Sequence, residues 1–353
     1  MRIGIIAASN IRYSPYIHFY TTLFKKMNVV YELIIPNREG LEEIFDAPLH
    51  VFPWEADKST LVNYYQYSRY IKKVLRKGKY DFLVVLTGNN AAFLGLWLKR
   101  NYQNKYIVDI RDYSHENIYP YFLLEKAAIT NSRLNVISSS KFMNFLPEAE
   151  YCVCHNCSYI NQTMPAFIHG QIPIKIGYVG GLYYVEQCTK LMKLVAADSR
   201  FCFEFYGTSP MEKIMREAAE AFDCERIIFH GGYLPQEKGR ILQQVDILFN
   251  AYGNGCALLD YALSNKLYDA YAYIKPILTS PGTYMSEMAG PLSFELDFGE
   301  SDIMNKLYSW YMQINPNDVE AFAARKLNEV VQENEFTKKK IEEAVLAGSQ
   351  VKE

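Results

Sequence analysis

The chain of 353 residues has no apolar run of the ~18 residues that a membrane span requires, and it carries little net charge. The apolar segment 3–8 is short and polar residues follow it, so we interpret it as a first β-strand and not as a signal peptide. A formal net charge of −2 argues against general nucleic-acid binding. We therefore expect a globular cytoplasmic protein that does not bind nucleic acid.

The sequence also lacks a dinucleotide fingerprint and a paired set of zinc ligands. The turn after the first predicted strand is Ala7-Ala8-Ser9-Asn10, not a G-x-G-x-x-G turn, which argues against a nicotinamide-dependent dehydrogenase. The seven cysteines are an odd number, which fits reduced thiols better than disulfides. No second cluster accompanies Cys152, Cys154 and Cys157, so we predict buried thiols on a last strand and no metal.

Short apolar runs alternate with helical patterns along the chain, which indicates parallel sheets with helices on both faces. A segment rich in Asn, Gln, Gly and Pro at 161–173 separates two series of such runs and is a linker by composition. We therefore predict an α/β protein of two doubly wound, Rossmann-like domains facing a cleft. The runs lie at 2–8, 29–35, 82–86, 106–110, 134–138 and 151–154, then at 174–180, 201–206, 226–230, 245–250 and 277–279.

The most informative local pattern is a basic and an acidic residue at the start of a predicted helix. Lys266 and Asp269 follow Ser264-Asn265 and lie three residues apart, so they share one helical face. A helix N-terminus offers unpaired N–H groups and a positive dipole, which suit a diphosphate, and an acidic side chain can hold ribose hydroxyls. The pattern predicts a nucleotide site, and an exposed surface ion pair is the alternative.

The segment 265–270, followed by Lys275-Pro276-Ile277, resembles the nucleotide-sugar signature of bacterial family-four glycosyltransferases, which have the GT-B fold. Segments similar to other landmarks of that family follow in the expected order: 106–112, 136–140, 155–156, 176–182, 203–207, 227–231 and 245–249. The resemblance covers nearly the whole chain.

The resemblance implies three parts. Residues 1–165 form an acceptor-side domain, 172–316 form the nucleotide-sugar donor domain, and helices in 317–353 pack back toward the first domain. It implies a nucleotide-diphosphate sugar as co-substrate, with no cofactor and no metal, and the lack of a D-x-D motif agrees with this. Lys266 would also stabilise the leaving group. The implied donor-binding residues are Gly180, Gly181, Gly207, Asn254, Gly255, Asp260, Asn265, Lys266, Leu267 and Asp269.

Three positions depart from the family pattern. Gly181 stands where many members have Arg, and Glu186 lies where a Lys is usual. Tyr261 replaces the first acid of the E-x7-E pattern that ends at Asp269, and Asp260 is one position away as its substitute.

In the first half, polar and charged residues follow the predicted strands, where ligands of such sheets bind. Asp112 could bind an acceptor hydroxyl or act as a general base, and Arg111 could bind phosphate. The alternative is an Asp–Arg ion pair that fixes the loop. The acceptor-side candidates are Ser9, Asn10, Asn89, Arg111 and Asp112.

The segment Arg69–Lys79 combines an apolar helical stripe with many cations. A helix that packs on the core and exposes a basic back explains it. The second interpretation is attraction to an anionic membrane, since each cation near such a surface is worth ~1 kcal/mol. It would place the protein on the inner face of the cytoplasmic membrane.

Taken together, the sequence predicts a metal-independent glycosyltransferase of the hexosyltransferase type. By resemblance, it would retain anomeric configuration and build capsule, exopolysaccharide or O-antigen on a glycan or lipid-linked oligosaccharide acceptor. Two alternatives stay open: a non-catalytic glycosyltransferase-like subunit, and a nucleotide-sugar epimerase of the same architecture.

Overall fold

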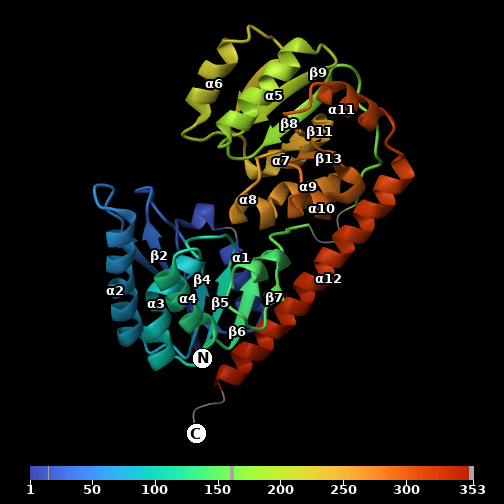
Figure 1. Ribbon diagram of the computed structural model, residues 1–353. Helices are drawn as coiled ribbons and strands as arrows, with labels where there is room; N and C mark the ends of the chain where they lie inside the picture. The colour runs from blue at the N-terminus through green and yellow to red at the C-terminus, as the bar shows by residue number, and fades with distance from the viewer. Residues whose placement is uncertain (15, 160–162, 350–353) are drawn as a thin grey trace. The chain divides into compact units, whose positions relative to one another are not determined.

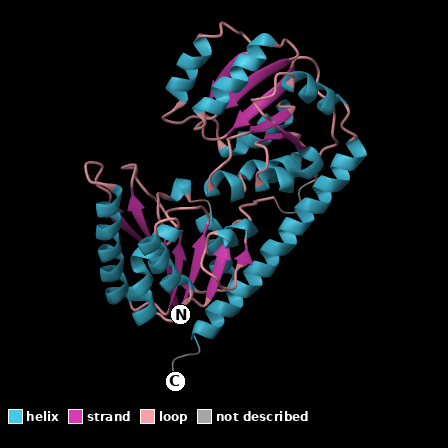
Figure 2. Ribbon diagram, viewed as in Figure 1, coloured by secondary structure: helices cyan, strands magenta, loops and turns pink. Residues whose placement is uncertain are grey.

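The computed structural model describes residues 1–14, 16–159 and 163–349. The chain divides into two compact units, which are described separately. Unit 1 comprises Met1–Asn156 with the described part of Gln332–Glu353, and unit 2 comprises Cys157–Val331. In each unit a sheet lies between layers of helices (Figures 1 and 2).

Unit 1 contains a seven-stranded sheet in the order β3-β2-β1-β4-β5-β6-β7, and every neighbouring pair is parallel. The order reverses beside β1, which is the feature that opens a crevice at the carboxyl ends of strands in doubly wound sheets. The strands are β1 Arg2–Ile6, β2 Val30–Asn37, β3 Leu49–Pro53, β4 Phe82–Leu86, β5 Tyr106–Ile110, β6 Leu134–Ile137 and β7 Cys152–Val153.

The helices of unit 1 cover this sheet because each has an apolar face. α1 shares one buried cluster with β1, β2 and β4 through residues such as Phe24, Ile5 and Leu33. α3 packs against both α2 and α4, with Gly95 of α3 against the backbone of Leu124. The helices are α1 Tyr16–Lys26, α2 Thr60–Gly78, α3 Gly88–Asn101 and α4 Tyr119–Ile129, with short 3-10 turns η1 Ile11–Tyr13 and η2 Ser140–Asn144.

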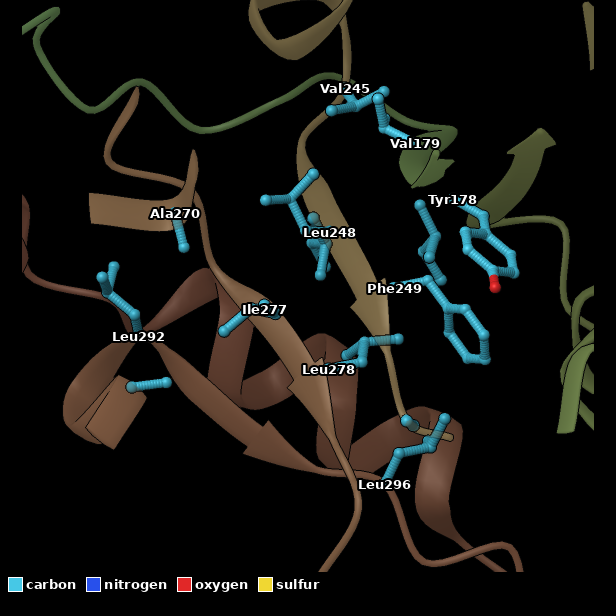
Figure 3. Packing of buried hydrophobic residues seen from close by; sticks show 14 of the residues in the cluster. Tyr178, Val179, Val245, Leu248, Phe249, Ala270, Ile277, Leu278, Leu292 and Leu296 are labelled. Carbon is cyan, nitrogen blue, oxygen red and sulfur yellow. The ribbon is translucent and has the colours of Figure 1, made fainter. Parts of the chain in front are cut away.

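Unit 2 contains a six-stranded parallel sheet in the order β10-β9-β8-β11-β12-β13. The strands are β8 Ile174–Val179, β9 Phe201–Tyr206, β10 Ile227–Gly231, β11 Ile247–Asn250, β12 Ile277–Thr279 and β13 Ser293–Glu295. The central strands are buried on both faces, and Tyr178 of β8 lies beside Phe249 of β11 in the core (Figure 3).

Helices of unit 2 connect successive strands, as a parallel sheet requires, and α11 follows the last strand. They are α5 Val185–Ala197, α6 Glu212–Glu220, α7 Lys238–Gln244, α8 Ala257–Tyr261, α9 Asn265–Tyr273, α10 Tyr284–Ala289 and α11 Ile303–Met312, with 3-10 turns η3 Pro235–Glu237 and η4 Gly290–Leu292. Leu267 and Ala270 of α9 join the buried core of the unit (Figure 3 shows Ala270).

The last helix, α12 Pro316–Ser349, belongs to both units. Its first part places Val319, Ala323, Leu327 and Val330 in the core of unit 2. Its second part returns to unit 1, where Ile341, Ala344 and Val345 pack with α1 and the sheet. The prediction of two doubly wound domains with a C-terminal helix that returns to the first is confirmed.

Two strands escaped the sequence analysis, and both lie at a sheet edge. Only Phe52 of β3 is buried and the strand ends in Pro53, and β13 has only three residues. An edge strand is buried on fewer sides, so it lacks the continuous apolar run that marks a central parallel strand. The fourth donor-domain strand also begins at Ile247, two residues later than predicted.

Candidate functional site

A glycine follows the carboxyl end of each of two neighbouring strands in unit 2. Gly180 follows β8 with a φ of +128°, and Gly207 follows β9 with a φ of +140°, backbone conformations that L side chains rarely adopt. A Cβ on Gly207 would lie 1.9 Å from the carbonyl oxygen of Gly180. The two turns therefore touch through bare backbone, which leaves room for a ligand to approach.

Lys266 extends from the start of α9 to this turn. Its Nζ lies 4.8 Å from the centroid of the Tyr178 ring and 5.4 Å from that of Tyr252. It also lies 3.5 Å from the place that a Cβ on Gly180 would take. Among the residues that the structure describes, no carboxylate forms an ion pair with Lys266. The two rings orient an ammonium group whose counter-ion the described protein does not supply.

Burial lowers the pKa of Lys266 to about 8, and the charges of Asp269 and Lys238 act in opposite directions on it. The side chain is 7% exposed. Desolvation is the larger effect because it removes water from the ammonium without replacing it by a close anion. An anionic ligand beside Nζ would restore the ordinary pKa, and it would gain binding energy in doing so.

The start of α9 is capped by Ser264, whose Oγ accepts a hydrogen bond from the Lys266 N–H at 3.2 Å. This cap sets the point at which the helix begins and places Lys266 in its first turn, where the positive end of the helix dipole lies. Asn265 is exposed at the same end, whereas Leu267 is fully buried in the core of unit 2. Leu267 therefore positions the helix, and its side chain does not face solvent.

Asp269 is 2% exposed and is held by two partners that sequence reasoning missed. Lys238 of α7 donates to its Oδ1 at 2.7 Å, and the Tyr159 hydroxyl donates to the same oxygen at 2.6 Å. Nothing in the sequence around Lys238 marks it, because its partner is distant in the chain and only the packing of α7 on α9 joins them.

The loop between β11 and α8 is fixed by hydrogen bonds at several points. Asp260 Oδ1 accepts from the Gly255 N–H at 2.8 Å, and the Ser280 hydroxyl accepts from the Gly253 N–H at 2.7 Å. Asn254 donates to the carbonyl oxygen of Pro281 at 2.8 Å. Asp260 thus acts on the loop that carries Asn254 and Gly255, both of which are exposed.

Gly181, which the sequence analysis predicted, and Asn250, which it did not, lie at the ends of the neighbouring strands β8 and β11. Gly181 is exposed, and a Cβ there would lie 2.6 Å from the ring of Tyr183. At the end of β11 the buried Asn250 leaves its Oδ1 without a hydrogen bond within the described chain. An unpaired buried amide oxygen is costly, and it marks this sheet end as a place where a ligand or water completes the bonding.

The acceptor-side candidates fall into different environments. Arg111 is buried and donates to Asp109 Oδ2 at 2.7 Å and to the carbonyl oxygen of Cys154 at 2.6 Å. Arg111 therefore forms the loop-fixing ion pair that the sequence analysis gave as the alternative to phosphate binding. Asp112, the next residue, is exposed.

Asn10 is fully buried and serves a loop of its own unit. Its amide donates to Asn37 Oδ1 and to Glu43 Oε1, each at 2.7 Å, and its oxygen accepts from the Arg38 N–H. Ser9 Oγ lies 2.7 Å from Ser14 Oγ. Asn10 therefore orders the segment that presents Arg38.

A cavity of about 650 Å³ lies among α2, α3, α4 and the segments before them in unit 1. Its walls are mainly apolar and aromatic, and the polar groups among its lining residues include Arg38 and the predicted Asn89. The sequence analysis missed this cavity, because three helices form most of its wall and the spacing of residues along the chain does not indicate which helices pack together.

The basic helix of the sequence analysis is α2. Tyr67, Ile71 and Leu75 are buried, while Arg69, Lys73 and Arg76 are exposed, as expected for a helix that packs on the core and has a basic back. Over the described residues, no helix has the length and apolarity to span a membrane.

The seven cysteines are free thiols, with Cys154 buried and Cys152 and Cys157 partly buried. Within residues 1–14, 16–159 and 163–349, no cluster of His, Cys, Asp and Glu is arranged to hold a metal ion.

Comparisons with known proteins find likeness in structure alone. No protein-family model matches the chain, and no curated protein matches it. The lipopolysaccharide outer core galactosyltransferase WaaB in its apo form superposes with a TM-score of 0.64 at 13% identity, covering 98% of this chain and 99% of that one. Anabaena Alr3699/HepE in complex with UDP and glucose gives a TM-score of 0.67 at 12% identity, covering 97% and 99%.

Neighbours of other activities share the same fold. Sucrose-phosphate synthase from Thermosynechococcus elongatus gives a TM-score of 0.71 at 8% identity, covering 98% of each chain. A structure described as a UDP-N-acetylglucosamine 2-epimerase from Listeria monocytogenes gives 0.63 at 10% identity, covering 95% and 94%. The chain has the GT-B fold that these proteins define.

Proposed function

We propose that this protein is a glycosyltransferase that moves a sugar from a nucleotide-diphosphate donor to a glycan acceptor. The observation that carries the proposal is Lys266. Its ammonium group is buried, is oriented by two tyrosine rings, faces the glycine turns, and has no anionic partner in the described chain. A diphosphate supplies the missing charge. UDP is the first nucleotide to test, because a neighbouring structure, HepE, is a complex with UDP-glucose.

The remaining donor-side groups have separate roles in this proposal. Lys266 and the α9 N-terminus would stabilise the negative charge that develops on the leaving diphosphate. Asp269 would take ribose hydroxyls through Oδ2, since both of its hydrogen bonds within the described chain fall on Oδ1. The exposed loop at Asn254 and Gly255 would contact the donor sugar.

On the acceptor side we propose that Asp112 contacts the acceptor hydroxyl, since it is exposed at the carboxyl end of a central strand. The resemblance to family-four enzymes supports retention of configuration without a metal, a lipid-linked oligosaccharide acceptor, a capsule, exopolysaccharide or O-antigen product, and work in the cytoplasm at the inner membrane face. The basic back of α2 supports the membrane contact.

An epimerase is the second candidate, because neighbours include structures described as UDP-N-acetylglucosamine 2-epimerases. Such an enzyme would convert a nucleotide sugar without any acceptor. A non-catalytic subunit is the third, because Lys238 already pairs with Asp269 and Gly181 and Glu186 replace basic residues of the family pattern.

The test is a thermal-shift and calorimetric panel of UDP, GDP, ADP, CMP and dTDP, each with its sugars, on wild type, Lys266→Met and Lys193→Met. Lys193 is exposed on α5 of the same unit, so it controls for the loss of one charge. A ligand at 100 times its Kd stabilises by about 2.7 kcal/mol. We expect one nucleotide to bind wild type and Lys193→Met, and Lys266→Met to lose at least about tenfold in affinity.

The same titration checks the charge on Lys266. Affinity should fall as pH rises beyond about 8, because the free protein loses the Lys266 proton there. Without ligand, Lys266→Met should be more stable than wild type by about 1–2 kcal/mol at pH 7, because it removes a desolvated charge. Equal nucleotide affinity in wild type and Lys266→Met would exclude this site. Conversion of the sugar without an acceptor would favour the epimerase, and binding without turnover would favour the subunit.

A further inference from the structure

The cavity of unit 1 combines apolar walls with one cation whose partner is missing. Leu61, Tyr64, Phe93, Ile118, Tyr121 and Leu124 form most of its wall. Its volume of about 650 Å³ lies in the range of small-molecule sites. Its surroundings are apolar too, because Leu61 is 70% exposed and Ile118 is 50% exposed at its edge. Such walls offer water few hydrogen bonds, so a hydrocarbon chain is a more favourable occupant than water.

Arg38 gives the cavity its polarity. Its guanidinium carbon lies 4.3 Å from the Trp54 ring centroid and 5.1 Å from that of Tyr64, and the Tyr64 hydroxyl accepts one of its N–H groups. Its Nε is buried without a hydrogen bond, and it forms no ion pair with any carboxylate of the described chain. The fully buried Asn10 orders the backbone at Arg38. The guanidinium is therefore held in place without a carboxylate of the described chain beside it, which suits a phosphate.

We propose that this cavity binds a single-chain amphiphile that carries a phosphate. The phosphate contacts Arg38, and the part of the hydrocarbon chain next to the phosphate lies against the apolar walls. The charge at the cavity selects the head group, because Arg38 is the only Lys or Arg among the described lining residues and no carboxylate lines it. If the proposed function holds, this ligand is the lipid end of the acceptor. The binding itself depends on neither Lys266 nor a nucleotide.

Calorimetric titration of the full chain with monomeric decyl phosphate tests the proposal, with hexyl phosphate, decanol and inorganic phosphate as matched probes. Each buried methylene is worth about three- to fourfold in affinity, so decyl phosphate should bind far more tightly than hexyl phosphate. Loss of the phosphate contact in decanol should cost roughly tenfold. Inorganic phosphate should bind weakly or not at all. Tryptophan fluorescence supplies a second signal, because Trp54 lies against Arg38.

Two pairs of variants localise the binding. Arg38→Gln should weaken decyl phosphate roughly tenfold and leave decanol unchanged, whereas Arg69→Gln, an exposed cation on α2 outside the cavity, should change neither. Leu61→Asp should weaken decyl phosphate by at least tenfold, whereas Leu96→Asp should not, because Leu96 is 62% exposed on α3 but does not line the cavity. Because Leu61 and Leu96 are both exposed, we expect both variants to fold, and thermal melts check this.

Several results would overturn the proposal. One is equal affinity for decyl phosphate and decanol, and another is an equal loss in Arg38→Gln and Arg69→Gln, which would indicate general surface attraction. A third is no dependence on chain length in the wild type, a result that needs no variant. The Lys266→Met variant should bind decyl phosphate normally. A failure to bind nucleotide would therefore not contradict this inference, and a failure to bind the amphiphile would not contradict the proposed donor site.

Discussion

At the scale of single residues, two buried ionisable side chains show the same physical effect with opposite signs. Burial lowers the pKa of Lys266 to about 8 and raises the pKa of Glu125 to about 9, because low dielectric disfavours the charged form of either group. Lys266 faces the glycine turns of the candidate donor site. Glu125 follows Leu124, which lines the unit 1 cavity, and both of its oxygens are buried without a hydrogen bond in the described chain.

The pKa of Glu125 predicts how stability depends on pH. A glutamate in the unfolded chain releases its proton near pH 4.3, whereas folded Glu125 keeps it up to about pH 9. The folded state therefore binds more protons between these values, and stability falls as pH rises through that window. Glu125→Gln removes the penalty, so we expect it to stabilise unit 1 by about 2–4 kcal/mol at pH 8 and by little at pH 4. Urea unfolding at both pH values measures this.

Glu148→Gln is the matched control, since Glu148 is exposed and should give a flat response. The second, smaller cause of the shift is the charge of Glu116, whose own pKa is raised by burial. A stabilisation of Glu125→Gln that is equal at pH 4 and pH 8 would show that packing and not ionisation is responsible.

At the scale of elements, the candidate donor site depends on the contact between the turns after β8 and β9. The Gly180 N–H donates to the carbonyl of Tyr206, and the Gly207 N–H donates to the carbonyl of Gly231, so three adjacent strand ends are tied together. The proposed anion site depends on this scaffold because Lys266 reaches the first of these turns.

Substitution at Gly207 tests that scaffold. Gly207→Ala would bring a Cβ to within 1.9 Å of a backbone oxygen in a conformation with positive φ, so we expect a loss of at least about 3 kcal/mol in the stability of unit 2. Gly255→Ala should cost only about 1–2 kcal/mol, since its φ of +88° is strained but no atom lies within 4 Å of the added carbon. Thermal unfolding followed by calorimetry compares the two. Equal losses of stability in the two variants would mean that backbone strain alone causes the destabilisation. The turns after β8 and β9 would then move apart to accommodate the added Cβ.

At the scale of the whole molecule, one helix completes two cores. α12 contributes Val319 and Ala323 to unit 2 and Ile341 and Val345 to unit 1. The Thr337 hydroxyl also donates to the carbonyl of Val153 at 2.6 Å, which fixes the second part of the helix on unit 1.

This division predicts separable unfolding. Ile341→Asp places a charge in the core of unit 1 and should destabilise that unit by about 3–5 kcal/mol, while the nucleotide binding proposed for unit 2 stays intact at low temperature. Lys339→Asp, an exposed change two residues away, should have a small effect. Urea titrations read by circular dichroism, with and without nucleotide, would show the unit 1 transition alone moving to lower urea. A single transition that moves as a whole would show that the units unfold together.

Much of the fold could be read from the sequence, because central parallel strands are buried on both faces and appear as apolar runs such as 82–86. The position of Lys266 could be read as well, because the Ser264 cap and the helix pattern are local. The edge strands β3 and β13 could not, since an exposed edge needs no continuous apolar run.

The sequence by itself determined the α/β class, the two series of strands and the placing of Lys266 in the first turn of α9, because these depend on neighbours within a few residues. Only the tertiary structure decided that Arg111 is held by Asp109 and Cys154, and that Lys238 and Tyr159 hold Asp269. It also decided that Arg38 lines an apolar cavity that no carboxylate lines. The physical reason is that charge pairing and desolvation depend on which distant segments the packing brings together, and the spacing of residues along the chain does not record that.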